Sequence, residues 1–219
     1  MPVSDRVYSN IKKKWGHRTS WAVWADDEML EGRPSTSNIE DTGLFDKRTN
    51  PAILELCNPN FILLGLNCSN KIKLDTFANF HSAKGGDYKL RYALKNSPLW
   101  GAYMTDFFKD HSELSGKKAL AYYKKNPLKV QENVALLREE IRELEAQSPT
   151  IVCLGWGLYE TNYIQKNFPE LSVKHIPHYA GAPNDAQIYR LSVMKRVIDQ
   201  LGFEPWNDSM ENGWTLSRS

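Results

Sequence analysis

The chain has 219 residues, of which 41% are hydrophobic and 25% are charged, with a formal net charge of +2. This length and apolar content predict a single domain, residues 1–219, with a sizeable core, and we expect a monomer. The small net charge excludes a protein that coats a polyanion over its whole surface, but it allows a local basic patch that binds nucleic acid. No apolar run approaches the ~20 residues that span a membrane, so we expect no membrane partner.

The cysteines and the first residues indicate the cellular compartment. Cys57, Cys68 and Cys153 adjoin apolar runs and show no CxxC spacing, which favours reduced, buried thiols. The opening segment, MPVSDRVYSN, contains no apolar stretch of the kind found in signal peptides. We therefore expect a cytoplasmic protein with no metal site and no cofactor.

Four apolar runs have the length of β-strands. They follow an aromatic-rich, irregular N-terminal extension, about residues 1–58, which we expect to pack along the edge of a sheet. Each run is followed by glycine, asparagine or charged residues, which is typical of strand ends. In chain order the runs are FILLGLN (61–67), AYMTDFF (102–108), TIVCLGW (150–156) and SVKHIPH (172–178).

Helical patterns separate the later runs. Asn126 and Pro127 form the expected start of one helix, a cap residue followed by proline at the first helical position. This helix is predicted to end at Ser148, before a proline. Apolar residues then recur along it at three- and four-residue steps, which places them on one face: Val130, Val134, Leu137, Ile141 and Leu144.

A second helix is predicted over residues 185–201, with Asn184 as its cap and Gly202 as its stop. Strands that alternate with helices are typical of a parallel sheet covered on both faces. The fold class that we expect is therefore α/β, a three-layer α/β/α sandwich with a central, mainly parallel sheet of four strands.

Polar and aromatic side chains stand at the ends of the predicted strands. Parallel α/β sheets bind ligands outside the carboxyl ends of their strands. The first run ends in Asn67, the second carries Asp106, the third ends near Gly155, and the fourth ends at His178. We expect these four strand ends to meet at one pocket.

The first run resembles a motif of the uracil-DNA glycosylase superfamily. Gly65-Leu66-Asn67 is similar to the Gly-x-Asn strand end of the mismatch-specific branch, in which the last side chain handles the hydrolytic water. Phe80 lies 15 residues after Gly65, where the family has an aromatic residue that stacks on the flipped base. The resemblance implies that Asn67 is catalytic and that Gly65, Leu66 and Phe80 bind the substrate.

Two later segments extend the resemblance. YMTDFFK is similar to the family's second strand, with Asp106 in the base-reading position and Lys109 as the basic residue that follows, expected at the DNA. HIPHYAGAP is similar to the loop that pinches the DNA backbone, with Pro177 matched and His178 in the serine position. The resemblance implies a uracil-DNA glycosylase-like fold and a monofunctional DNA glycosylase that flips a base, leaves an abasic site and acts on DNA without a cofactor.

Three departures distinguish this chain from the family pattern. Cys68 and Ser69 stand where the family has a proline after Gly-x-Asn. Asp106 replaces an asparagine, and His178 replaces a serine. A carboxylate accepts hydrogen bonds, so Asp106 favours a base with an amine, such as a cytosine derivative, whereas a protonated Asp106 would still read uracil. A bulky cytosine target would fit antiviral defence as well as DNA repair.

Each candidate side chain suits one task in glycosidic hydrolysis. An amide oxygen such as that of Asn67 orients water without a shifted pKa. Stacking on Phe80, worth ~1–3 kcal/mol, would offset part of the energy of flipping a base. His178 would stabilise developing charge on a phosphate or on the leaving base, and Tyr179 would wedge into the gap in the DNA.

Structural explanations stay open for the same residues. Asn67 is also a common turn former. Phe80 lies three residues after Phe77, a helical packing spacing. Asp106 also suits a solvent-facing strand end, and His178 also suits a surface loop. Phosphate contact or a solvated charged face would each explain two basic clusters: Lys12, Lys13, Lys14, His17 and Arg18, and Lys117, Lys118, Lys124 and Lys125 beside Tyr122 and Tyr123.

Hypotheses from different classes fit these patterns. The first is the DNA glycosylase. The alternative is a non-catalytic uracil-DNA glycosylase-like module that binds modified DNA or a nucleotide, which the missing motif proline favours. A flavodoxin-like nucleotide enzyme ranks last, because the sequence has no phosphate loop of the GxGxxG or GK[ST] type.

Overall fold

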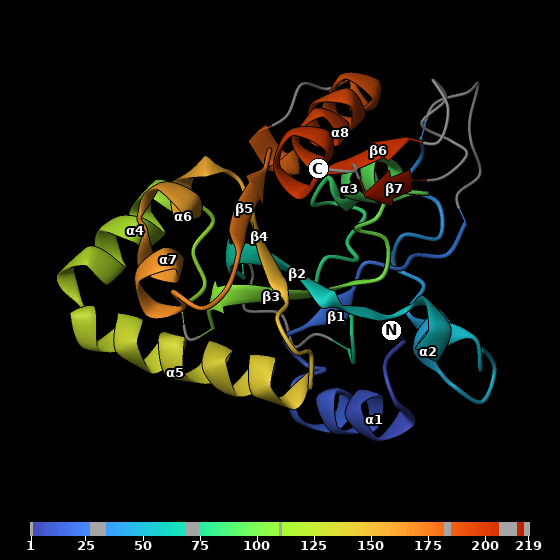
Figure 1. The fold of residues 1–219 in the computed structure, drawn as a ribbon, viewed down its shortest axis with the longest axis horizontal. Helices are drawn as coiled ribbons and strands as arrows, with labels where there is room; N and C mark the ends of the chain where they lie inside the picture. Colours follow the sequence, from blue (N-terminus) through green and yellow to red (C-terminus); the bar gives the residue numbers. More distant parts are fainter. Residues whose placement is uncertain are drawn as a thin grey trace.

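The computed structural model has α/β architecture, with a mostly parallel sheet between helices (Figure 1). It describes residues 2–26, 34–68, 75–109, 111–181, 185–205 and 214–216. The main sheet is formed by β1 (Ser20–Trp21), β2 (Asn58–Asn67), β3 (Ala102–Phe108), β4 (Thr150–Leu154) and β5 (Val173–Ile176). A separate two-stranded sheet contains β6 (Phe203–Pro205) and β7 (Trp214–Leu216).

The strand order of the main sheet is β1-β3-β2-β4-β5. The four strands from β2 to β5 run parallel to their neighbours, as expected, whereas β1 is antiparallel to β3. The sheet therefore has five strands, and Ser20 and Trp21 correct the expectation of four. These two residues are too few to show alternation in the sequence, which needs about four positions.

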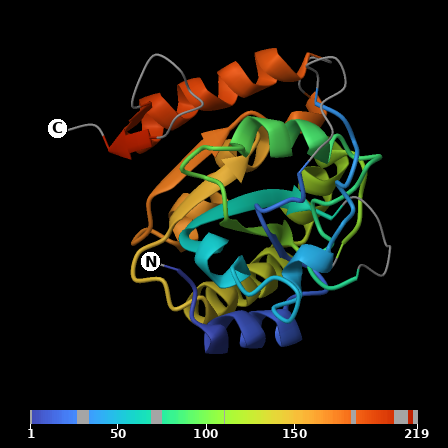
Figure 2. The same cartoon turned by 90° about the vertical axis from the view of Figure 1, so that its right-hand side faces the viewer.

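Helices cover both faces of the main sheet (Figure 2). On one face α3 (Asp87–Leu94) packs against α8 (Ala186–Leu201), and on the other α1 (Asp5–Lys14) packs against α5 (Pro127–Glu143). The core accordingly has two parts, one on each face of the sheet. The remaining helices are α2 (Ile53–Leu56), α4 (Gly116–Lys125), α6 (Trp156–Glu160) and α7 (Tyr163–Asn167), with 3-10 turns at Gly43–Phe45 and Tyr179–Gly181.

The helix predicted after Asn126 is α5. Pro127 is its first residue, as expected, but the side chain of Asn126 does not cap it, because Nδ2 donates to the Tyr122 carbonyl at 2.8 Å. The helix ends at Glu143, short of the expected Ser148, and Glu145 adopts a left-handed φ of 54°.

The second predicted helix is α8, and its cap differs from the expected one. Oδ1 of Asp185 accepts hydrogen bonds from the N–H groups of Gln187 and Ile188, the second and third residues of the helix, at 2.8 and 3.2 Å. The expected cap, Asn184, lies outside the described residues. Gly202 ends the helix with a φ of 67°, a left-handed conformation that glycine adopts without strain.

The N-terminal extension contains regular structure that its sequence did not indicate. The Ser4 side chain caps α1 by accepting a hydrogen bond from the Val7 N–H at 3.2 Å. Val7, Tyr8 and Ile11 are buried on the inner face of this helix. The expectation of an irregular extension is therefore corrected, since α1 covers part of the sheet and β1 extends its edge (Figure 1).

The topology selects one edge of the sheet for ligand binding. From β2 the chain crosses to β3 on one side, and from β3 it crosses to β4 on the other side of β2. The carboxyl ends of β2 and β4 thus form the topological switch point, where open parallel sheets bind their ligands. Among the helices of the described residues, none is both long and apolar enough to cross a bilayer.

Candidate active site

The carboxyl ends of β2 and β3 bring Gly65 and Asp106 together. The two residues are register partners on adjacent parallel strands, so they face the same side of the sheet. A Cβ atom on Gly65 would lie 2.3 Å from Oδ1 of Asp106 and 3.1 Å from Cζ of Phe80. Only glycine leaves room for the carboxylate and the ring edge to meet over this strand. Three residues that the sequence assigned to the substrate are therefore neighbours.

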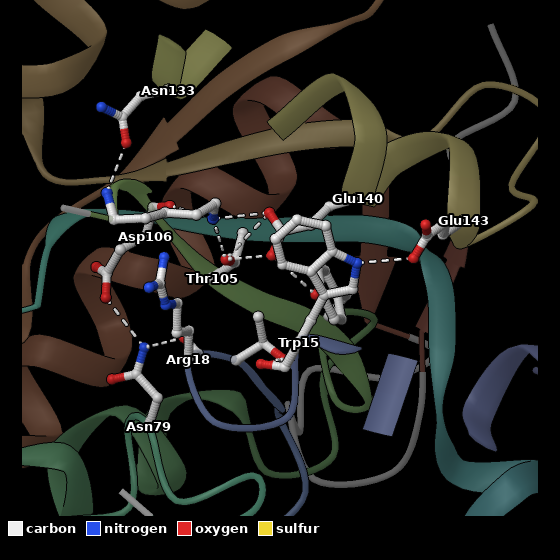
Figure 3. Close-up of polar contacts among 11 residues, drawn as sticks. Trp15, Arg18, Asn79, Thr105, Asp106, Asn133, Glu140 and Glu143 are labelled. Atoms are coloured by element: carbon white, nitrogen blue, oxygen red, sulfur yellow. Dashed lines mark hydrogen bonds and ion pairs between the residues drawn. The ribbon is translucent and has the colours of Figure 1, made fainter. Parts of the chain in front are cut away.

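Asn79 fixes the orientation of Asp106, which is 6% exposed (Figure 3). Nδ2 of Asn79 donates to Oδ2 of Asp106 at 3.0 Å and to the Arg18 carbonyl at 2.8 Å. Burial raises the pKa of Asp106 to about 6, although the Asn79 hydrogen bond and the charge of Lys109 oppose this rise. At neutral pH the group is mostly a carboxylate, with Oδ1 held at Gly65 as an acceptor.

A second buried carboxyl group, Asp87, acts on Asp106. Asp87 is 4% exposed and accepts hydrogen bonds from the Ser82 N–H at 2.7 Å and from the Tyr179 hydroxyl. Burial raises the pKa of Asp87 to about 6, and the charge of Asp87 contributes to the raised pKa of Asp106. Two like charges in one buried region favour a ligand that donates hydrogen bonds.

Asn67 is held by the loop that follows β3. Its Nδ2 donates to the carbonyls of Cys68, His111 and Glu113 at 3.1, 3.4 and 2.9 Å. Because the amide nitrogen faces these carbonyls, Oδ1 points away from them, and it accepts no hydrogen bond from the described part of the chain. Asn67 lies in β2 opposite Phe108 and has no positive φ, so the left-handed turn explanation is wrong.

Phe80 has a backbone conformation that is rare for a bulky residue. Both Phe80 and Phe77 adopt a left-handed φ of 64°, which persists only where the surroundings hold it. The Trp24 indole N–H donates to the Phe80 carbonyl at 3.1 Å, and the Phe77 N–H donates to the Gly16 carbonyl at 2.6 Å. The segment is not helical, so the two rings do not pack along one helix face. Both rings are nevertheless buried in the core, on opposite faces of the sheet, which confirms the structural explanation of Phe80 as a core residue. The Phe80 ring, 8% exposed, lies against Gly65.

His178 follows β5 and packs over Gly155 at the end of β4. A Cβ atom on Gly155 would lie 3.0 Å from the Cβ of His178. The Ala180 N–H donates to Nδ1 of His178 at 3.0 Å, which assigns the proton of the neutral ring to Nε2. Burial lowers the pKa of His178. The ring is therefore neutral at pH 7 and presents one N–H donor.

Three other candidates differ from their expected roles. Tyr179 is 9% exposed and donates its hydroxyl to Asp87, so it is buried and does not project as a wedge. The Pro177 carbonyl accepts a hydrogen bond from the Tyr189 hydroxyl at 3.0 Å, which ties this loop to α8. Leu66 packs against the first residue of α4, on the face of the sheet opposite Asp106.

Lys109 does not face solvent, which corrects the expectation that it contacts DNA. Its side chain is 1% exposed, and Nζ lies 2.7 Å from Oε2 of Glu140, which is 0% exposed. Nζ also donates to the Thr105 hydroxyl at 2.8 Å and to the Asp106 carbonyl at 2.7 Å. The Tyr103 and Thr105 hydroxyls donate to Oε1 of Glu140 at 3.2 and 3.1 Å.

This buried ion pair acts on the carboxyl group of Asp106 as well as on the fold. Removing two charges from water is expensive, and only such a complete set of hydrogen bonds offsets that cost. The charge of Lys109 lowers the pKa of Asp106, whereas the charge of Glu140 raises it. Because Lys109 also donates to the Asp106 carbonyl, the pair holds the backbone of Asp106 from the other face of the sheet.

Sequence reasoning missed Asn79, Asp87 and Glu140. Glu140 lies three residues after Leu137, and Asn133 lies four residues before Leu137, so Glu140 and Asn133 stand on the buried face of α5. A polar residue on an apolar helix face is a signal that would have found them. Asn79 and Asp87 come from a loop and a helix start, and no local pattern marks their partners.

A separate cleft of about 590 Å³ lies between α1 and the end of α5, and four cationic and two anionic side chains line it. Arg6 pairs with Glu145, and Lys14 pairs with Glu143. We assign no chemistry to this cleft, which is lined by Arg6, Asn10, Lys13, Lys14, Arg142, Glu143 and Glu145. Within the described ranges, no group of three or more His, Cys, Asp or Glu side chains is placed to hold a metal ion.

Comparison with known proteins adds no support to the resemblance, which rests on the residues named above. The chain matches no protein-family model, no curated protein and no solved structure.

Proposed function

We propose that the protein is a monofunctional DNA glycosylase with a uracil-DNA glycosylase-like fold, which hydrolyses the N-glycosidic bond of a flipped pyrimidine. The observation that carries the proposal is the meeting of Gly65, Phe80 and Asp106 at the carboxyl ends of β2 and β3. In this proposal the extruded base stacks on Phe80 and directs its pairing edge at Asp106. Flipping is required because the glycosidic bond of a stacked base is out of reach.

The carboxylate of Asp106 favours a cytosine derivative as the target. Oδ2 is occupied by Asn79, so Oδ1 is the atom that meets the base. Cytosine presents an amine that donates to this oxygen, whereas uracil presents a carbonyl whose lone pairs oppose it. Asp87 adds a second negative charge, which further favours a donor over an acceptor.

Asn67 and His178 supply the groups that hydrolysis needs. Oδ1 of Asn67 accepts a hydrogen bond from the attacking water and directs the water oxygen at C1′ of the sugar. The bond between C1′ and the base nitrogen breaks, the water oxygen bonds to C1′, and a proton passes to the base. The neutral His178 donates its Nε2–H to the base oxygen, where negative charge develops.

The buried ion pair supports hydrolysis without strand cleavage. Strand cleavage by a glycosylase needs an amine that attacks C1′, and Lys109 is the lysine next to Asp106. Its amino group is held by Glu140 and by two further oxygen atoms, so it is directed away from the proposed substrate. The expected product is therefore an abasic site in an intact strand.

Base release from matched oligonucleotides tests the proposal. Strands that carry uracil, cytosine or a 5-substituted cytosine are incubated with the protein, and abasic sites are detected by alkaline cleavage. Asn67→Ala is expected to slow single-turnover release by about a hundredfold or more, in the range that a positioned catalytic group contributes, with DNA binding unchanged. Asn60→Ala, an exposed asparagine on the same strand, is the matched control.

The outcome also separates the two classes of function. Release that depends on Asn67 supports the glycosylase. Tight binding of modified DNA with no release by the wild type would assign the chain to the non-catalytic alternative. Equal loss of binding and rate in Asn67→Ala would make the residue structural.

A further inference from the structure

The loop that holds Asn67 leads directly into α4. The carbonyls of His111 and Glu113 accept the hydrogen bonds of the Asn67 amide, and α4 begins three residues later. On its other side α4 contacts α6, where a Cβ atom on Gly157 would lie 3.6 Å from Cδ1 of Leu120. The outer surface of α4 therefore adjoins the carboxyl ends of both β2 and β4.

The exposed face of α4 carries lysines and no acidic residue. Ala119 and Tyr123 are buried, and the Tyr123 ring stacks on Phe108 with ring centroids 3.3 Å apart, which fixes the face that points outward. Two lysines elsewhere, Lys14 and Lys47, show the contrast, because each has an acidic partner. Within the described residues no ion pair is found for the exposed lysines of α4: Lys117, Lys118, Lys124 and Lys125.

An aromatic pair lies between these lysines. Tyr122 is 37% exposed and stacks on His111 with ring centroids 4.2 Å apart and an interplanar angle of 6°. Lys118, Tyr122 and Lys125 share one stripe of the helix, because they are four and three residues apart. A rise of ~1.5 Å per residue separates the two lysines by ~10 Å along the helix, far enough apart to contact different phosphates of one strand. Leu114, 80% exposed, lies at the end nearest Asn67.

We propose that this α4 surface, formed by His111, Leu114, Lys118, Tyr122 and Lys125, binds the DNA strand next to the flipped nucleotide. Cations that alternate with exposed rings are the pattern of single-strand binding, in which lysines contact phosphates and rings stack on bases. Exposed tyrosines also occur at membrane and protein interfaces, so binding to an anionic lipid surface is one outcome of the test below. The inference rests on the proposed function, since it gives the strand a path beside Asn67.

Salt dependence of binding by the full chain tests the α4 surface. The probe is a fluorescein-labelled single strand of mixed sequence, followed by anisotropy. Lys118→Ala/Lys125→Ala is expected to reduce the slope of log K against log salt by about 1.4, at ~0.7 per lost phosphate contact. Tyr122→Ala is expected to weaken binding about fivefold or more with the slope unchanged, whereas Tyr122→Phe keeps wild-type affinity because its ring still stacks.

The control removes the same charge elsewhere. Lys174→Ala/Lys195→Ala takes two lysines from β5 and α8, and its slope is expected to equal that of the wild type. Equal slopes for the two double variants, or wild-type affinity in Tyr122→Ala, would overturn the inference. So would equally tight binding to anionic lipid vesicles that does not depend on Tyr122. Because no readout requires base release, α4-dependent binding without release would leave this inference standing and reject the proposed hydrolysis.

Discussion

Asp106→Asn is expected to exchange the base that the site reads. Nδ2 of Asn79 is a donor, and its second hydrogen bond, to the Arg18 carbonyl, keeps it in place. The new amide must therefore turn its oxygen toward Asn79 and its NH2 group toward Gly65, where Oδ1 of Asp106 lies. An acceptor at the base edge becomes a donor, while the shape of the side chain stays the same.

The exchange predicts opposite changes for the two bases. A cytosine amine would face the new NH2 group, and a buried donor without an acceptor costs ~1–3 kcal/mol. That range corresponds to about a 5- to 150-fold loss in kcat/KM for the cytosine derivative, with a gain of similar size for uracil. Because burial raises the pKa of Asp106 to about 6, the wild type should also lose its cytosine preference as the pH falls through that value.

The assay is single-turnover base release from otherwise identical oligonucleotides, measured on both sides of pH 6. The readout is the ratio of release from the cytosine derivative to release from uracil. This ratio should rise with pH in the wild type and stay low and flat in Asp106→Asn. Asp199→Asn, an exposed carboxylate on α8, is the matched control and should leave the ratio unchanged. A wild type that prefers uracil, with the same preference in Asp106→Asn, would refute the reasoning.

The same geometry makes three stability predictions. Gly65→Ala should abolish base release and lower the free energy of unfolding by ~1–3 kcal/mol, because the new Cβ would lie 2.3 Å from Oδ1 of Asp106. Release rates check the first effect, and urea unfolding checks the second. Lys109→Met should lower the free energy of unfolding by ~3–5 kcal/mol, since it leaves Glu140 buried without its cation. In the same urea assay, the double variant Lys109→Met/Glu140→Leu should recover most of that stability, because neither charge of the pair remains buried. The free energy of unfolding should also fall as the pH rises from about 4 to about 6, because the raised pKa values of Asp87 and Asp106 make the folded state bind more protons than the unfolded chain in that window. Asp87→Asn/Asp106→Asn should flatten this slope, and an unchanged slope would contradict the burial that we assign to the two groups.

The sequence by itself determined the parallel core of the sheet and the positions at its carboxyl edge. The runs predicted at 61–67 and 102–108 lie within β2 and β3, because strand length and apolar character are local properties. Gly65 and Asp106 could be expected near one another, since strands of this kind place their carboxyl ends at one edge. Their direct pairing needed the strand order and register, which no local pattern contains.

Only the tertiary structure decided which polar side chains are exposed and what they contact. Lys109 is a basic residue after a strand in the sequence, but it is buried because α5 places Glu140 opposite it. Asn79 reaches Asp106 across 27 positions of the chain, through a loop without a periodic pattern. The physical reason is common to both: burial and pairing depend on segments that are distant in sequence, and these contacts set the charge and the direction of each group at the site.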